Sequence, residues 1–458
     1  MSLPTASIEV LPPEILLPIV TSLPGLDTLW DLLRASPNVW RLFNENALYI
    51  IENILSGPNA ILPPVVAEAV RAVIVARSEA LPFRNLHEFQ HQFLVKLFPV
   101  FRTINKTMDN LINIEHQVLS AAAPSVFVLR STVATAYQIS ALSQACLSSY
   151  LERLRDLSFR PMHCLDPNLS YSSSYGSRYG VEWVPAWDRV FQGTPAKVVD
   201  AGQPNWVEEM RAVRALWIIQ LVGEVQCQRE RDTLDWPNED VDKLKDMNPA
   251  DMIDRNQYPE ALQKSEEVKS LMHYIATLGE VKQNTDTYYR LPPPPPFVRW
   301  ITAPPNRNER FYKFLRYRWD GTPLSFRYPT DDHFWGRTEE ALRQEAPGML
   351  IYRRLNRPLT DTVGASPIEG VKFGSFRQLG FAFWDTWRMH LLGMHSGLDD
   401  HILPSDSFYM FAWESILPTD EVASLKAELR EQWRIMLQRH ELNQKRIQED
   451  DQEGEESS

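Results

Sequence analysis

Apolar residues recur every three to four positions through the first fifty residues, and this period predicts three short helices. Pro12 and Pro13 suit the first turn of a helix, because a proline has no N–H to leave unpaired there. Glu14 lies in the same turn, where the helix dipole favours a negative charge. The apolar positions are Leu11, Ile15, Ile19 and Leu23 in the first helix, Leu29 and Leu33 in the second, and Val39, Trp40 and Phe43 in the third.

Three helices of this length contain too few residues to bury all of their apolar side chains among themselves. A partner is the natural way to cover the remaining apolar surface. We therefore expect residues 8–55 to form a small domain that binds a partner. The alternative is that the same surface packs against the rest of the chain.

Helical periods continue beyond this segment and predict a mainly α fold. Amphipathic patterns cover residues 62–77, 86–98, 126–157, 207–225, 259–279, 376–391 and 420–447, with 126–157 forming either one helix or two. We expect them to build a large irregular helical body, residues 61–445, with long loops and no sequence repeats. The pattern leaves room for a small β element around residues 311–328 and for a subdivision of the body near 282–300.

Four stretches depart from the helical pattern. Residues 166–204 are rich in Ser, Tyr, Gly and Pro and predict a long loop, and residues 235–254 form a polar interruption. The five prolines from Pro292 to Pro296 can be neither helix nor central strand, which favours polyproline II. Residues 447–458 are acidic and almost free of apolar side chains, so we expect a disordered tail.

Three of the predicted helices carry more detailed signals. Asn85 can cap the helix at 86–98, and Glu88 can reach back toward that cap. Thr419 can cap the last helix. The expected buried face of the helix at 376–391 is Phe376, Leu379, Phe383, Trp384, Trp387 and Leu391, and that of the last helix is Val422, Leu425, Leu429, Trp433 and Met436.

Composition and charge indicate the cellular compartment of the protein and the classes of partner that it can bind. The chain has 458 residues and a net charge of -12, and an acidic surface repels phosphates, which argues against nucleic-acid binding. Its three cysteines are far apart in sequence, which favours a reducing compartment over a disulfide framework. Residues 1–10 lack a signal-peptide pattern, and no apolar run reaches the length of a membrane span. These features predict a cytoplasmic or nuclear protein with no membrane association.

Candidate chemistry is sparse. His390, His395, Asp399, Asp400 and His401 are a possible metal cluster, but their spacing matches no zinc pattern. Cys164 adjoins His163, although a catalytic cysteine and its base normally come from distant positions. Asp331, Asp332 and His333 fit a helix cap better than a catalytic group. With no phosphate-binding or nucleophile-elbow motif in the sequence, we expect no catalytic residue, no metal and no cofactor.

Two further segments could bind a partner. Arginines and a lysine alternate with aromatic residues between Arg307 and Arg327, an arrangement that could stack bases or grip an acidic peptide. Cation–π and ion-pair packing against a core is the interpretation that we favour. The proline run could bind an SH3 or WW domain, or it could serve only as a stiff connector.

The first helices resemble the F-box, whose pattern is Leu-Pro-x-Glu followed by apolar residues at helical spacing, a leucine-rich second helix, and a Val-aromatic ending. The positions that match are Leu11, Pro12, Glu14, Ile15, Ile19, Leu23, Leu29, Leu33, Val39 and Trp40. Two sequence segments are similar to those of F-box proteins of filamentous fungi: the residues from Leu33 to Phe43, and the segment from Gly380 to Arg388. Two departures are Pro18, which should kink the first helix, and Ser36-Pro37 before the third.

The resemblance implies a function without catalysis in this chain. It implies that residues 8–55 dock a Skp1-like adaptor within a cullin-based ubiquitin ligase, while the helical body presents an unknown protein substrate. Partner enzymes would carry out ubiquitin transfer. The alternatives are a helical interaction protein whose F-box-like start serves packing only, and a metal-dependent enzyme that uses the cluster from His390 to His401.

Overall fold

The computed structural model is mainly helical, as the sequence predicts. It describes residues 8–97, 111–156, 162–163, 194–195, 202–252, 261–279, 288–305, 342, 346–349, 373–385, 388–389 and 416–456. The chain divides into two compact units. Unit 1 comprises Met1–Leu154, Ala201–Pro347 and Arg377–Trp387, and unit 2 comprises Arg155–Asp200, Gly348–Phe376 and Arg388–Ser458.

The N-terminal segment of unit 1 forms three helices, as expected. A 3-10 turn (Ile8–Val10) precedes α1 (Pro13–Thr21), α2 (Leu26–Ala35) and α3 (Pro37–Ser56). Helices α1 and α2 both pack against α3. The chain remains α-helical across Pro18, although its ring removes one helical donor. Ser36 caps α3, because its Oγ accepts the N–H of Val39 at 3.2 Å, and Pro37 takes the first helical position.

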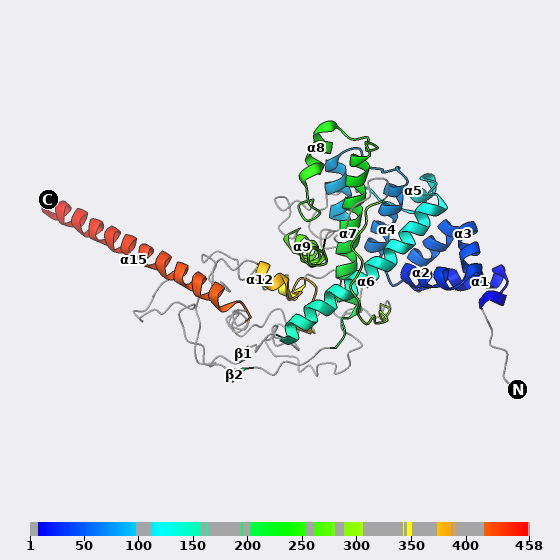
Figure 1. The fold of residues 1–458 in the computed structure, drawn as a ribbon. Helices are drawn as coiled ribbons and strands as arrows, with labels where there is room; N and C mark the ends of the chain where they lie inside the picture. The colour runs from blue at the N-terminus through cyan, green and yellow to red at the C-terminus, as the bar shows by residue number, and fades with distance from the viewer. Residues whose placement is uncertain are drawn as a thin grey trace, which may run out of the picture. The chain divides into compact units, whose positions relative to one another are not determined.

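Helices α4 (Pro64–Arg77), α6 (Val126–Asp156), α7 (Trp206–Glu230) and α9 (Ala261–Thr277) follow, and α4, α6 and α7 lie side by side in unit 1 (Figure 1). Helix α4 packs along α7, which also contacts α9. Helix α6 is one continuous helix, which decides between the two alternatives for this stretch. A capping box fixes the start of α7: Asn205 accepts the N–H of Glu208 at 3.1 Å, and the Glu208 carboxylate accepts the N–H of Asn205 at 2.9 Å.

The helix predicted at residues 86–98 is present over the described residues 86–97, but only residues 86–87 are α-helical. The rest consists of a π-helical turn (Glu88–Phe93) and a 3-10 turn (Leu94–Leu97). Asn85 caps it as predicted, through a 2.8 Å bond from the N–H of Glu88, but the Glu88 carboxylate accepts from the N–H of Arg84. Phe89 and Phe93 both pack on the Phe83 ring, so the unusual turns serve an aromatic cluster.

The polar stretch at 235–254 contains a helix that the apolar pattern does not reveal. Helix α8 (Asn238–Asp246) has acidic residues in its first turn and lysines in its last turn, an order that suits the helix dipole. Lys243 bonds Glu239 one turn away at 2.8 Å. Charge order and (i, i+4) pairing therefore support α8 in place of an apolar stripe.

The long helix predicted at 376–391 is interrupted: among its described residues, 376–377 and 388–389 are helical and 378–385 are not. Helix α12 spans only Gly374–Arg377, and turns follow from residue 378 to 383. Gly380, within these turns, adopts a φ of +76°, which a helix does not allow, and a Cβ at this position would lie 2.7 Å from the Trp384 ring. Trp384 and Phe383 are buried as expected, whereas Trp387 and Leu391 lie outside the described residues.

Unit 2 contains the last helix, α15, which runs from Thr419 to Glu456. It extends past residue 447, where we expected disorder, because Glu, Gln, Lys and Arg are favourable helix formers even without apolar neighbours. Thr419 is the first residue of the helix and not its cap. The predicted buried stripe is also wrong where its side chains are described: Leu429 is buried, Val422 and Leu425 are half-buried, and Met436 is exposed, while the Trp433 side chain lies outside the description.

The remaining predictions concern regions with little or no described structure. A two-residue antiparallel pair joins β1 (Met162–His163) to β2 (Thr194–Pro195). Most of the loop predicted at 166–204, the β element at 311–328 and the arginine-aromatic stretch lie outside the described residues. Among the described helices, none is long and apolar enough to cross a membrane. The domain boundaries that we predict near residues 55–61 and 282–300 concern independent folding and stay predictions.

Candidate functional site: the outer face of the first helix

Helix α1 has two adjacent apolar faces, about 100° apart around the helix axis, that differ in burial. Leu16 and Val20 point into the three-helix segment and are 2% and 0% exposed. Ile15 and Ile19 lie one turn apart on the neighbouring face and are 52% and 41% exposed. Leu11, one turn before Ile15, is half-buried. Leu11, Ile15 and Ile19 define what we call the outer face of α1, an apolar strip on an otherwise well-packed segment.

The structure separates the ten residues that match the F-box pattern into three groups. Four are exposed, namely Pro12, Glu14, Ile15 and Ile19. Leu11, Leu23 and Trp40 are half-buried. Leu29, Leu33 and Val39 are buried and belong to the core of the three-helix segment. Only the first two groups have surface with which to meet a partner, so the buried three hold α2 and α3 in place behind the outer face.

The three-helix segment is fastened to the rest of unit 1 by polar contacts. Arg130 of α6 lies over the Trp40 ring at 4.1 Å and donates to Asn44 at 2.8 Å. Asp27 of α2 accepts from Ser140 of α6 at 3.1 Å. These contacts leave the outer face of α1 uncovered and fix its direction relative to α6.

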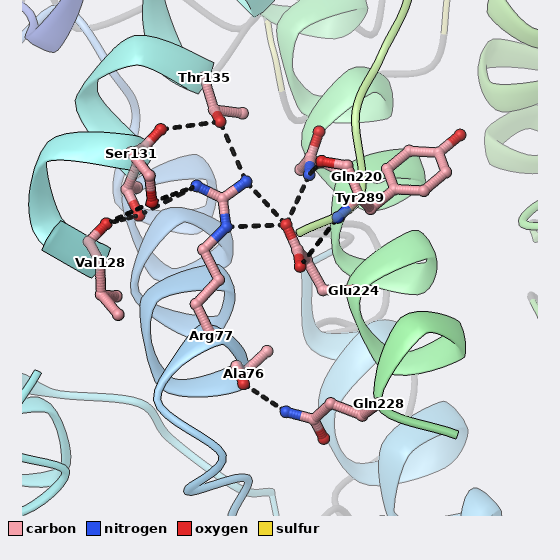
Figure 2. A network of polar contacts seen from close by, with 10 residues as sticks. Ala76, Arg77, Val128, Ser131, Thr135, Gln220, Glu224, Gln228 and Tyr289 are labelled. Carbon is pink, nitrogen blue, oxygen red and sulfur yellow. Dashed lines mark hydrogen bonds and ion pairs between the residues drawn. The ribbon is translucent and has the colours of Figure 1, made fainter. Parts of the chain in front are cut away.

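A second feature of unit 1 is the burial of charged side chains on α7. Arg77, at the end of α4, donates its Nε to Glu224 Oε1 at 2.7 Å, and the two side chains are 2% and 1% exposed. Figure 2 shows the guanidinium between α6 and α7, where it also bonds the hydroxyls of Ser131 and Thr135 at 3.1 and 3.0 Å. The Glu224 carboxylate also receives the Gln220 amide at 2.7 Å. The Arg77–Glu224 ion pair is thus hydrogen-bonded on both sides by side chains of α6 and α7.

Other charged groups on α7 are held in the same way. One nitrogen of Arg214, Nη2, donates to both carboxylate oxygens of Glu267 on α9, at 2.8 and 2.7 Å. Arg211 donates to the backbone carbonyl of Phe383 at 2.8 Å. Burial lowers the pKa of Arg211 from its ordinary value, and Glu267 opposes that shift. Both buried arginines of α7 therefore bond groups that are remote in sequence.

Glu209 is a buried carboxylate that is held by neutral donors. Its Oε1 accepts from Gln144 at 3.0 Å and from Thr302 at 2.8 Å, and its Oε2 accepts from the Trp300 indole at 3.0 Å. Burial raises the pKa of Glu209, and these hydrogen bonds oppose the shift. Burial likewise raises the pKa of Glu224, against the effect of Arg77.

The pattern of apolar residues on α7 gives no sign of this buried polar set. Met210, Val213, Trp217 and Leu221 form the apolar stripe that the sequence predicts, and all four are buried. The charged residues between them are buried too, because their partners come from α4, α6, α9 and residues 289–302. The one local signal is the density of Glu, Arg and Gln on a helix that is otherwise apolar on every side.

The described residues show no metal-ligand cluster, and their two cysteines, Cys146 and Cys227, are free thiols. No three of their His, Cys, Asp and Glu side chains are arranged to hold a metal ion. Burial raises the pKa of the Cys227 thiol to about 11, with Glu224 adding to the shift, and burial raises that of Cys146 further, so both stay protonated at neutral pH. Cys164 and the cluster from His390 to His401 lie outside the described residues.

The polar side chains that surround Arg77, Glu209 and Glu224, which we call the buried network, are enclosed within unit 1 and are not accessible to a partner protein. The outer face of α1, in contrast, exposes apolar side chains that no described residue covers. Comparison with protein-family models, curated proteins and solved structures finds no match to this chain.

Proposed function

We propose that the protein is a substrate-recruiting adaptor of a cullin-based ubiquitin ligase. In this proposal the outer face of α1 docks a Skp1-like adaptor, and the helical body holds a protein substrate. No residue of the chain takes part in ubiquitin transfer, and the protein works in the cytoplasm or nucleus.

One observation carries the proposal: Ile15 and Ile19, two large apolar side chains, are exposed one turn apart on the same face of α1. Covering the exposed half of each side chain would contribute roughly 1 kcal/mol per residue. Leu11 and Leu23 extend the strip in both directions, and Glu14 beside it adds a charge that can select a basic partner. These are positions at which the chain resembles the F-box.

A pull-down with a purified Skp1-like adaptor tests the proposal. The full-length chain should retain the adaptor, and the double variant Ile15→Asp, Ile19→Asp should lose it, since a buried unpaired carboxylate is costly. Phe127→Asp is the matched control, because Phe127 is 65% exposed but lies at the start of α6, outside the three-helix segment. Failure of the wild-type chain to bind, or equal binding by wild type and double variant, would reject the proposal.

A second candidate function rests on the contacts between the three-helix segment and α6. Trp40 lies beneath Arg130, and Asp27 is bonded to Ser140, so this segment is also part of a larger helical unit. In that case the protein is a helical interaction protein in which the F-box-like start serves packing. The same pull-down separates the candidates, because the second one predicts no adaptor binding by the wild-type chain.

A further inference from the structure

The proline run lies on a segment with a regular pattern of exposure. In polyproline II the chain makes a turn every three residues and rises roughly 9 Å per turn, so every third side chain lies along one edge. Arg290, Pro293 and Pro296 are exposed and are spaced by three. The residues between them are buried or half-buried, with Leu291 only 2% exposed. We call Arg290, Pro293 and Pro296 the proline edge.

Contacts on the opposite side hold this segment against α6 and α7. The Gln138 amide of α6 donates to the carbonyls of Leu291 and Pro292 at 2.5 and 2.9 Å. Tyr289 bonds α7 twice: its N–H donates to Glu224 at 3.3 Å, and its carbonyl accepts from Gln220 at 2.9 Å (Figure 2). The beginning of the segment is therefore fixed by Glu224 and Gln220, and Glu224 is itself held by Arg77.

The far end is held as firmly. Arg299 lies over the Tyr137 ring at 4.8 Å and donates to Ser140 at 2.8 Å. Trp300 donates its indole N–H to Glu209 at 3.0 Å, and its carbonyl accepts from Gln144 at 3.1 Å. Anchors on both sides hold the proline run in place with Pro293 and Pro296 outward, and the chain bends at Pro296. A ligand fixed in this way loses little conformational entropy when it binds.

We propose that the proline edge is a docking site for an SH3-type domain. Such domains hold two prolines three positions apart in aromatic-lined grooves, and they recognise the polyproline II conformation that the composition of this segment favours. Arg290 stands three residues before Pro293, where its charge would meet the acidic pocket beside those grooves. The order Arg-x-x-Pro-x-x-Pro fixes the direction in which the segment lies on the domain.

Burial of Leu291 distinguishes this partner from other proline-binding domains. A domain that must grip an apolar side chain immediately before the prolines would need Leu291, which is enclosed and whose carbonyl is bonded to Gln138. Such binding would require the segment to detach from α6. The SH3 mode uses only side chains that are already exposed, so the segment can stay where it is.

Titration of the full-length chain into labelled SH3 domains tests the proposal. The panel should contain domains that select Arg-x-x-Pro-x-x-Pro, domains that select the reverse order, and one domain that selects Leu or Phe before prolines. We expect saturable binding to the first class, weakened at least about tenfold by Pro293→Ala with Pro296→Ala, and by a smaller factor by Arg290→Glu.

Pro294→Ala with Pro295→Ala is the matched control, because it removes two prolines from the same run at half-buried positions. It should weaken binding to the first class less than about threefold. Thermal unfolding of every variant checks that the segment remains attached. Binding by none of the first class, or equal weakening by the edge pair and the control pair, would overturn the proposal, as would a clear preference for the domain that grips Leu291.

Discussion

Helices α1 and α7 distribute their side chains in opposite ways. Helix α1 exposes isoleucines, whereas α7 buries glutamates and arginines. The difference lies in the neighbours that the fold supplies: α7 receives polar partners from α4, α6, α9 and residues 289–302, while the outer face of α1 receives none among the described residues. A buried charge that is bonded by other parts of the fold is a structural element, and an exposed apolar strip is a surface available for binding.

The largest expected effect on stability tests the buried side of this comparison, by removing one partner of the Arg77–Glu224 ion pair. Arg77→Ala leaves Glu224 buried without its cation, which should lower the free energy of unfolding by about 3 to 5 kcal/mol. Urea unfolding measures the change. Arg231→Ala is the control, since the pair that Arg231 makes with Glu79 is 24% and 47% exposed and should contribute about 1 kcal/mol or less. Equal losses in the two variants would contradict a structural function for the buried pair.

A smaller loss should follow from crowding the contact between α7 and the proline segment. A Cβ on Gly223 would overlap the ring of Tyr289, so Gly223→Ala should cost about 1 to 3 kcal/mol. Gly374→Ala serves as the comparison, because no atom lies near the position of its Cβ. If both variants unfold at the same urea concentration as the wild type, Tyr289 does not rest on α7.

Glu209 gives a prediction about pH. Its pKa is raised above the ordinary 4.5 because burial disfavours the carboxylate, so the folded protein binds this proton more tightly than the unfolded chain. The stabilisation is therefore complete below about pH 4.5 and is lost as the pH rises through the raised pKa. Glu209→Gln has no such proton and offers one acceptor oxygen instead of two, at a cost of about 1 to 2 kcal/mol.

Urea unfolding of wild type and Glu209→Gln across the pH range checks the sign. Wild type should lose stability relative to the variant as the pH rises from 4.5. Because both proteins keep Glu224, whose pKa is also raised by burial, its contribution cancels in the difference. If the stability of wild type minus that of Glu209→Gln stays constant or increases as the pH rises, Glu209 is not in the enclosed position between Gln144 and Trp300.

The smallest effect on stability belongs to α1. Because Ile15 and Ile19 are exposed, each change to Asp should alter the free energy of unfolding by about 0.5 kcal/mol or less. The same urea experiment measures it for the double variant. A loss of several kcal/mol would show that the isoleucines are buried in solution, and the contrast with α7 would disappear.

Residue pattern predicts the parts of this fold that depend on neighbours close in sequence. The three N-terminal helices, α4, α6 and α7 follow from the apolar period, and the cap at Asn85 is visible as a residue type. The interruption of the helix expected at 376–391 is not visible in the apolar period: Gly380 adopts a φ of +76° and packs against Tyr150, which lies 230 residues earlier in the chain. The partners of Glu224 and Glu209 lie as far away as Arg77 and Trp300, so no local signal reveals them.

Calorimetric titration of a purified Skp1-like adaptor into the full-length chain tests the central claim most directly. If the outer face of α1 docks the adaptor, binding should be saturable with one site per chain and should show a negative heat-capacity change, since apolar surface leaves water. Ile15→Asp with Ile19→Asp should abolish the signal while the protein stays folded, and Phe127→Asp should retain it. A wild-type chain that gives no binding heat at any temperature, or a double variant that binds with unchanged affinity and heat capacity, would contradict the account.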